Sequence, residues 1–147
     1  ATGIRVSELR EITAEAVASG RAEIANKGKR RSIFLSEKLC RLLKSYLKRN
    51  GITAGPVFVT RSGRPLDRSN IWRDMKVLCK SAGVKPDKVF PHNLRHLFAR
   101  TFYTQEKDLS RLADILGHTS VNTTRIYTAE SGLIHARQME RMGLIVT

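Results

Sequence analysis

Apolar residues recur at helical spacing over most of this chain, and the clearest amphipathic helix follows Ser36. Ser36 is suited to the N-cap position, and Asn50 with Gly51 can end the helix. Its apolar face comprises Leu39, Leu42, Leu43, Tyr46 and Leu47. This spacing predicts a helix that packs one side against a core.

A second helix is predicted from Asp67 or Ser69, either of which can cap it, to a stop before Gly83. Its apolar stripe comprises Ile71, Trp72, Met75, Leu78 and Cys79. We interpret both helices as scaffold, and Tyr46 and Trp72 as packed aromatic residues.

Four further helices are predicted from Pro91 onwards, and Pro91 suits the first turn of a helix. In the first of them, Leu94, Phe98 and Phe102 repeat every fourth residue, towards a core. The next, "LSRLADIL", can be capped by Asp108 and ended by Gly117. Ser120 can cap a short helix that carries Tyr127, and a last helix is predicted over 133–145.

In the N-terminal third, apolar and polar residues alternate over shorter distances, as is typical of strands and turns. A short helix is predicted over 4–12, and "AEAVASGRAEI" is predicted to turn at Ser19 and Gly20 like a hairpin. Residues 32–35 are strand-like, "PVFVT" is a short strand or extended segment, and "RSGRP" is a turn. The predicted class is α+β, mainly helical, with a small antiparallel sheet near the N-terminus.

Length and composition favour one packed domain over residues 1–147. The sequence has no apolar run of membrane-spanning length and no leader-like segment, so we expect a soluble, cytoplasmic protein with no membrane partner. Cys40 and Cys79 lack a metal-type spacing, which favours reduced thiols packed as small hydrophobes.

The charge narrows the choice of partner. Twenty-seven Lys and Arg residues against 13 Asp and Glu leave a net charge of +14. Such an excess predicts a polyanionic partner, and nucleic acid is favoured over a membrane surface because no helix combines a basic face with a broad apolar one. The tip of the predicted hairpin is the densest basic cluster, with Lys27, Lys29, Arg30 and Arg31.

Several polar residues have an ordinary interpretation when each is taken alone. His92 and Arg95 could be surface or structural residues of a helix, His118 could cap a helix C-terminus, and Tyr127 could be a packed aromatic. Their order along the chain is more specific. The segments "ATGIRVSEL", "KGKRRSIFL", "PHNLRHLFA" and "LGHTSVNTTRIYT" together resemble the tyrosine recombinase (phage integrase) family, over nearly the whole chain.

This resemblance implies an enzyme that breaks and rejoins DNA strands through a covalent 3′-phosphotyrosyl intermediate, without a metal or other cofactor. It implies a partner, double-stranded DNA, on which a homo-tetramer is expected to assemble. The catalytic residues that it implies are Arg5, Lys27, His92, Arg95, His118 and Tyr127. Lys29, Arg30 and Arg31 are expected to contact the DNA.

The residue types suit that chemistry. Guanidiniums such as those of Arg5 and Arg95 can bind phosphate oxygens bidentately and stay charged at neutral pH. We assign a contact to a phosphate oxygen to His118, and proton transfer with the nucleophile Tyr127 to His92. A lysine on the hairpin can protonate the leaving oxygen, and the motif favours Lys27, with Lys29 as the alternative.

The family's catalytic domain has further helices before the first arginine, so this chain is expected to be an N-terminally truncated fragment. Cleavage in cis or in trans stays open, as does an integrase against a chromosome-dimer-resolving role. Two other functions compete. One is a non-catalytic DNA-binding module, which needs only the positive charge. The other is a metallohydrolase that uses His92 and His96, which Asn93 disfavours because the usual glutamate is missing.

Overall fold

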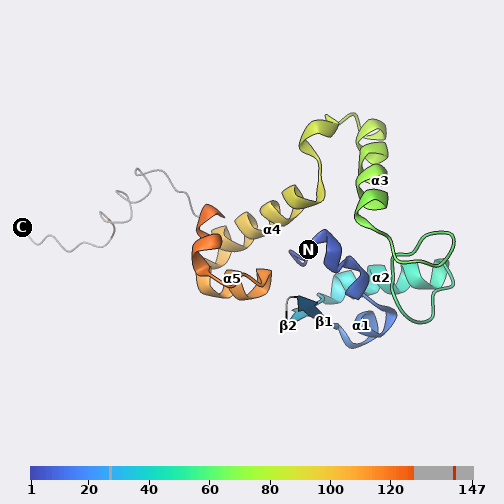
Figure 1. The fold of residues 1–147 in the computed structure, drawn as a ribbon, viewed down its shortest axis with the longest axis horizontal. Coiled ribbons are helices and arrows are strands. Elements are labelled where there is room, and N and C mark those ends of the chain that lie inside the picture. Colours follow the sequence, from blue (N-terminus) through green and yellow to red (C-terminus); the bar gives the residue numbers. More distant parts are fainter. Residues whose placement is uncertain (27, 128–140, 142–147) are drawn as a thin grey trace, which may run out of the picture.

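The computed structural model describes residues 1–26, 28–127 and 141. Its α-helices are α1 (Ala14–Ser19), α2 (Glu37–Arg49), α3 (Arg68–Ser81), α4 (Pro91–Glu106) and α5 (Leu109–Leu116) (Figure 1). The strands are β1 (Arg21–Asn26) and β2 (Lys29–Phe34). Four 3-10 helices complete the description: η1 (Val6–Glu11), η2 (Pro86–Lys88), η3 (Val121–Thr123) and η4 (Arg125–Tyr127). The predicted class is confirmed, and the helix predicted over 133–145 lies outside the described residues.

The sheet is a two-stranded antiparallel hairpin whose two faces differ sharply. Ala22 pairs with Ile33, and Ile24 pairs with Arg31. Ala22, Ile24 and Ile33 are buried, whereas Phe34, one position further along β2, is exposed. This period of two follows from the pleat of a strand, and it turns one face of the hairpin into the protein.

A first apolar cluster lies between η1, α1, the hairpin and α2. Val17, Ile24 and Val57 are its largest fully buried side chains. Helix α2 begins where predicted, because Ser36 Oγ accepts a hydrogen bond from the Leu39 backbone N–H at 3.3 Å. Of the predicted apolar face of α2, Leu43 and Leu47 are buried in this cluster and Leu39 and Tyr46 pack against it.

A second apolar cluster joins α4, α5 and η4. Ala99, Leu112, Leu116 and Tyr127 are buried in it, and Phe98, Phe102 and Tyr103 pack against them. Asp108 caps α5 as predicted, with its Oδ1 accepting from the Arg111 backbone N–H at 2.8 Å. Gly117 ends α5 in the left-handed region, with φ of 64°.

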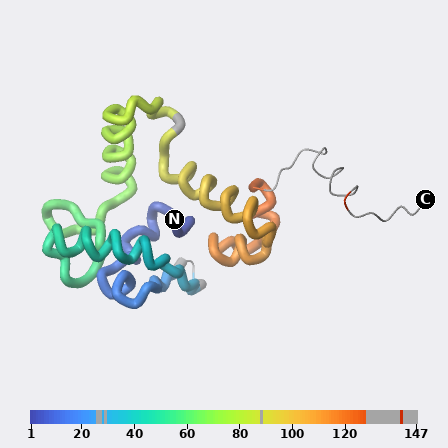
Figure 2. The backbone as a smooth tube through the Cα atoms, turned by 180° about the vertical axis from the view of Figure 1, so that it is seen from behind, coloured from blue at the N-terminus to red at the C-terminus, as the bar shows by residue number. Residues whose placement is uncertain are grey.

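The N-terminal segment connects the two clusters by lying directly on α4. A Cβ at Gly3 would stand 2.4 Å from Phe98 Cδ1, so the backbone approaches the aromatic ring more closely than any side chain allows. Figures 1 and 2 show this blue segment between the hairpin and α2 on one side and α4 on the other. The segment thereby brings Arg5 beside α4.

Two predictions for the N-terminal third were wrong in detail. Ala14–Ser19 is helix α1, not the arm of a hairpin, because Thr13 Oγ1 caps it by accepting from the Ala16 N–H at 3.2 Å. The hairpin turn lies instead between β1 and β2. The segment "PVFVT" bends at Val57 and Phe58 and forms two isolated bridges, Thr13 with Pro56 and Val59 with Pro65, instead of a strand.

Helix α3 was predicted to pack its apolar stripe as part of the scaffold, and this was wrong for most of the residues in the stripe. Asp67 caps it, since its Oδ1 accepts from the Asn70 N–H at 2.8 Å. Of the predicted apolar stripe only Cys79 is buried, while Trp72 and Leu78 are exposed by 53% and 65%. The reason is its placement: α3 stands away from both apolar clusters (Figures 1 and 2).

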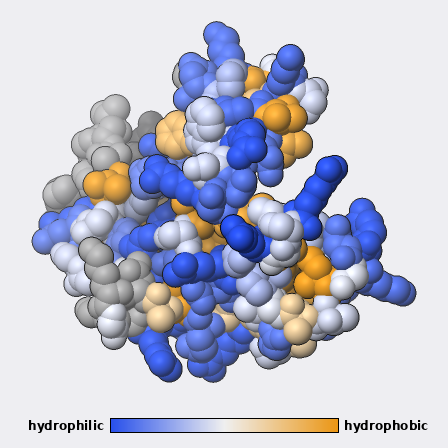
Figure 3. All heavy atoms as spheres, turned by 45° about the vertical axis from the view of Figure 1, so that its right-hand side comes forward, coloured by the Kyte–Doolittle hydropathy of each residue, from blue (hydrophilic) through white to orange (hydrophobic). Residues whose placement is uncertain are grey.

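Other apolar side chains also reach the surface. Leu94 of α4 and Leu42 of α2, both predicted to face a core, are exposed. Figure 3 shows such residues as separate orange patches on a mostly hydrophilic face. Cys40 and Cys79 are buried free thiols, as predicted. In the part of the chain that the structure describes, none of the helices has the length and hydropathy needed to cross a bilayer.

The neighbouring residues Leu42 and Leu43 test the first cluster with identical substitutions, because they are 62% and 9% exposed. We expect Leu43→Ala to lower the free energy of unfolding by about 2–4 kcal/mol, since it removes buried methyl groups and leaves a cavity. Leu42→Ala should change it by less than about 0.5 kcal/mol. Urea unfolding followed by circular dichroism measures both. Equal losses would contradict this assignment of the core.

Candidate active site

One pocket of about 650 Å³ brings together side chains from distant parts of the chain. Five of the six predicted catalytic residues line it: Arg5, His92, Arg95, His118 and Tyr127. Trp72 and Arg68 of α3 form part of its wall. The sixth, Lys27, lies outside the described residues. The pocket is therefore built by the N-terminal segment, α3, α4, the end of α5, and η3 with η4.

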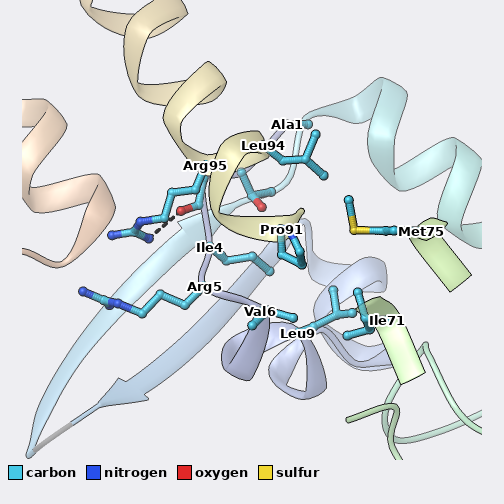
Figure 4. Close-up of a pocket in the computed structure, with 12 residues that line it drawn as sticks. Ala1, Ile4, Arg5, Val6, Leu9, Ile71, Met75, Pro91, Leu94 and Arg95 are labelled. Atoms are coloured by element: carbon cyan, nitrogen blue, oxygen red, sulfur yellow. Dashed lines mark hydrogen bonds between the residues drawn. The ribbon is translucent and has the colours of Figure 1, made fainter. Parts of the chain in front are cut away.

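Arg5 and Arg95 reach the pocket from different elements and point the same way. Figure 4 shows both side chains extending away from the apolar residues of a neighbouring pocket, such as Leu9 and Met75. Arg95 is buried, and its Nη1 donates to the carbonyl oxygen of Gly3 at 2.6 Å. This bond ties α4 to the N-terminal segment beside Arg5.

The C-terminal end of α5 holds three arginines through three consecutive carbonyl groups. The last carbonyls of a helix lack intrahelical partners and carry the negative end of the helix dipole. Here each receives one guanidinium. The bonds run from Arg31 Nε to Ile115 O (3.2 Å), from Arg95 Nη2 to Leu116 O (2.7 Å), and from Arg5 Nη2 to Gly117 O (3.4 Å).

Glu8 is the buried carboxylate that balances part of this charge. Its Oε1 accepts from Arg5 Nη1 at 3.0 Å, and its Oε2 accepts from the Arg5 backbone N–H at 2.8 Å. Arg31 binds the same two oxygens, with Nη1 at 3.0 Å and Nη2 at 2.7 Å. Burial acts to raise the pKa of Glu8, but hydrogen bonds from Arg31 and Arg5 outweigh it and hold that pKa below its ordinary value.

The location of Arg95 lowers the pKa of its guanidinium, but the group keeps its charge. Burial first, and then the neighbouring charge of Arg5, lower the pKa of Arg95 to about 10. A group with this pKa is protonated at neutral pH. The pocket therefore keeps a buried cation beside Arg5.

His118 is fixed between Arg95 and a buried threonine. Its Nε2 lies 3.2 Å from Arg95 Nη2, and its Nδ1 lies 2.7 Å from Thr124 Oγ1. Because a guanidinium can only donate, this network assigns Nε2 as the acceptor and places the proton on Nδ1. Burial, followed by the charges of Arg95 and Arg5, lowers the pKa of His118, which agrees with a neutral ring.

His92 and Tyr127 also line the pocket, and His96 contacts both of them. The Nε2 atoms of His92 and His96 lie 2.7 Å apart, so one donates to the other. The ring of His96 meets the ring of Tyr127 edge-on, with centroids 5.0 Å apart. Burial, and then the charge of His92, lower the pKa of His96. Tyr127 itself is packed into the second apolar cluster, and the neighbouring Thr124 is fully buried.

The hairpin cations do not share one environment. Arg30 is exposed on β2, as expected of a residue that contacts DNA, and Lys29 begins the same strand. Arg31 was grouped with Lys29 and Arg30 as an expected DNA contact, but its side chain turns inward to Glu8 and Ile115. The reason is the strand period: Arg31 lies on the same face as Ile33 and opposite Ile24, both of which are buried.

Comparison with known proteins agrees with this geometry. Residues 1–132 match the model of the phage integrase family. The chain belongs to the phage integrase family. Among its relatives, the tyrosine recombinase XerD of Xanthomonas campestris pv. campestris is 37% identical over 160 residues, which cover 96% of this chain and 50% of the relative. The tyrosine recombinase XerA of Pyrococcus furiosus is 31% identical, over 98% of this chain and 52% of that protein.

Solved structures of recombinases share the fold. A crystal structure of XerA recombinase superimposes with a TM-score of 0.75 at 30% identity, covering 99% of this chain and 53% of that one. The structure of XerH site-specific recombinase bound to difH substrate superimposes with a TM-score of 0.78 at 28% identity, covering 97% of this chain and 43% of that one. The catalytic domain of bacteriophage HP1 integrase, at 24% identity, has the same fold with a TM-score of 0.64. The chain spans about half the length of the recombinases XerD and XerA that it matches in sequence.

Sequence reasoning missed three residues of this integrase-family site. Glu8 had a usable signal, because a carboxylate three residues after Arg5 can accept a hydrogen bond from the Arg5 backbone N–H at the start of η1. Thr124 had none, since it is one of four threonines between 119 and 128 and only the fold selects it. Trp72 was assigned to the core because helical spacing reports a face and not what covers that face.

The structure also bears on the metal-site alternative. Across residues 1–26 and 28–127, together with Arg141, no three His, Cys, Asp or Glu side chains are grouped as a metal would require. His92 and His96 do approach each other, but as a hydrogen-bonded pair. The described part of this family member therefore offers no metal-ligand set.

The lowered pKa of Glu8 makes part of the stability depend on pH. Because the folded-state pKa lies below the ordinary 4.5, the ionised carboxylate stabilises the fold above that pH, and this contribution is lost as pH falls through the folded-state pKa. We expect Glu8→Gln to destabilise the chain at neutral pH by about 3 kcal/mol or more, since it breaks a buried ion pair. The gap from wild type should narrow in acid.

Urea unfolding at a series of pH values measures this difference. Glu23→Gln is the control, because Glu23 also pairs with an arginine but is exposed. A gap between wild type and Glu8→Gln that stays constant, or widens, below pH 4.5 would contradict the assigned charge state.

Proposed function

We propose that this chain cleaves and rejoins DNA strands in site-specific recombination, through a covalent 3′-phosphotyrosyl intermediate on Tyr127 and without a metal. The observation that carries the proposal is the single pocket lined by Arg5, His92, Arg95, His118 and Tyr127. These residues come from four separate segments, and they supply the cations, the imidazoles and the nucleophile that phosphoryl transfer needs.

A DNA phosphodiester would enter the pocket between Arg5 and Arg95. Both guanidiniums are held by backbone carbonyls and keep further N–H groups for the phosphate oxygens. Because protein contacts fix them before DNA arrives, little reorganisation is needed when negative charge develops on the phosphate. These two arginines therefore stabilise the transition state.

In the proposed reaction the phenolic oxygen of Tyr127 attacks phosphorus, and the bond from phosphorus to the 5′-oxygen breaks. His92 accepts the phenolic proton, and Lys27, or Lys29 in its place, protonates the leaving oxygen. The product is an aryl phosphodiester that conserves the energy of the broken bond. A 5′-hydroxyl of DNA then attacks the same phosphorus and releases Tyr127, so no nucleotide cofactor is consumed.

His118 has a role that changes with the charge in the pocket. Its Nε2 accepts a hydrogen bond from Arg95 when the pocket holds no phosphate. An incoming phosphate adds negative charge, raises the pKa of His118 and favours a proton on Nε2. The imidazolium can then donate to a non-bridging oxygen, which is the contact assigned to it.

We further propose double-stranded DNA as the partner, with a homo-tetramer assembled on it in the cytoplasm. The net charge of +14 supports binding to a polyanion. XerH, which shares the fold at 28% identity, is described as bound to difH substrate. The charge alone would equally suit a module that only binds DNA, so the test must report covalent chemistry.

Tyr127→Phe tests the proposal. We expect the wild-type chain to form a covalent adduct with duplexes that carry a nick in a randomised region. After cleavage, the short fragment between the cleaved bond and the nick dissociates with its 5′-hydroxyl, so the strand cannot be rejoined and the phosphotyrosyl bond is trapped. Denaturing electrophoresis and sequencing of the bound strand measure the adduct. The variant, which lacks the nucleophile, should bind the same duplexes and form none.

Tyr46→Phe is the matched control, because Tyr46 packs against the first cluster and does not line the pocket. It should form the adduct like wild type. No adduct with wild type, or an adduct that survives Tyr127→Phe, would overturn the proposed function.

A further inference from the structure

Arg31 occupies an inward position of β2 that its charge would not predict. The guanidinium spans both oxygens of Glu8, at 3.0 and 2.7 Å, and its Nε donates to Ile115 O at 3.2 Å. The side chains of Arg31 and Glu8 are only 14% and 5% exposed. A phosphate at the surface could not bind the two Nη atoms of this guanidinium, which form its planar fork, without displacing Glu8.

The contacts of Arg31 connect it to two parts of the proposed phosphate site, Arg5 and the turn that carries His118. Through Glu8 it reaches Arg5, whose Nη1 binds the same carboxylate oxygen as Arg31 Nη1. Through Ile115 O it reaches the end of α5, three residues before His118. A Cβ on Gly117 would lie 2.7 Å from Arg31 Nη1, so the guanidinium packs directly against the turn that presents His118.

We propose that Arg31 is a positioning residue for DNA cleavage, and not a DNA contact. It fixes the hairpin that carries Lys27 to Arg5 on one side and to the Gly117–His118 turn on the other. The proposal rests on the proposed function, because it assigns Arg31 a role in holding that same site. A guanidinium fits this task because its planar fork can bind two carboxylate oxygens and a carbonyl at once.

Arg31→Lys separates this role from a phosphate contact. Lysine keeps the charge, so it would serve nearly as well at a DNA phosphate, but it cannot reproduce the fork. We expect the single-turnover rate of adduct formation at saturating DNA to fall by about 10²-fold, the cost of a small misplacement of catalytic groups. The Kd for DNA, from fluorescence anisotropy, should change by less than about 3-fold, because no phosphate contact is lost.

Arg21→Lys is the matched control. Arg21 lies on the same hairpin and its Nη2 is 2.7 Å from Glu23 Oε1, but this pair is 55% and 54% exposed and does not line the pocket. We expect its rate and Kd to equal those of wild type. Rates are expressed per folded molecule, from circular dichroism, so that a loss of stability is not counted as a loss of rate.

Hydrogen exchange at the His118 amide gives a measurement that needs no DNA. This amide donates to Ala113 O at 2.9 Å at the turn that Arg31 packs against. We expect its exchange to be about 10-fold faster in Arg31→Lys, since the turn opens locally more often, and unchanged in Arg21→Lys.

The outcomes distinguish the two proposals. An unchanged rate in Arg31→Lys, or a weaker Kd with a normal saturated rate, would overturn the positioning role. If wild type forms no adduct, the proposed function fails, and exchange at His118 alone decides whether Arg31 holds the turn. Unchanged exchange in Arg31→Lys would then overturn this inference as well.

Discussion

The hydrogen bonds between three arginines and the carbonyl end of α5 are the interaction on which the rest of the site depends. Helix α5 ends at Gly117, and its last carbonyl groups would otherwise need solvent. Arg31, Arg95 and Arg5 take one carbonyl each, and they come from β2, α4 and the N-terminal segment. One helix end thereby joins the apolar cluster under the hairpin to the cluster between α4 and α5. The pocket lies along this polar seam, so the bonds that hold the two halves together also set the geometry of the site.

The charge at this seam is unbalanced, and the imbalance matches the proposed ligand. The guanidiniums of Arg5 and Arg31 bind one carboxylate, Glu8, and Arg95 is a third cation nearby, which leaves a local excess of positive charge. Burial and the repulsion from Arg5 lower the pKa of Arg95, so bringing these cations together carries an electrostatic cost. A phosphodiester would relieve that cost by supplying negative charge where the arginines converge. Glu8 reduces the repulsion between Arg5 and Arg31, and the bonds to α5 fix each of the three guanidiniums at its own carbonyl group.

Local signals predicted much of this fold. The caps at Ser36 and Asp108, the stop at Gly117 and most of the apolar face of α2 depend on neighbours in sequence, and the structure has them where they were expected. Errors arose where burial depends on distant elements. Trp72 has a helical spacing suited to a core, yet α3 stands apart and leaves it beside the pocket. Arg31 seemed one of several basic residues at a hairpin tip, although its alternation with Ile33 and Leu35 placed it on the buried face. Its partner, Glu8, is 23 residues away, and no local pattern connects the two.

The most direct test of the central claim is a crystal structure of Tyr127→Phe bound to a duplex recovered from the covalent adducts. The account predicts one phosphodiester within hydrogen-bonding distance of Arg5, Arg95 and His118, with the ring of residue 127 beside its phosphorus. The bidentate pair of Arg31 with Glu8 should persist in that complex. A duplex whose nearest phosphate lies outside this pocket, or one that draws Arg31 away from Glu8 onto DNA, would contradict it.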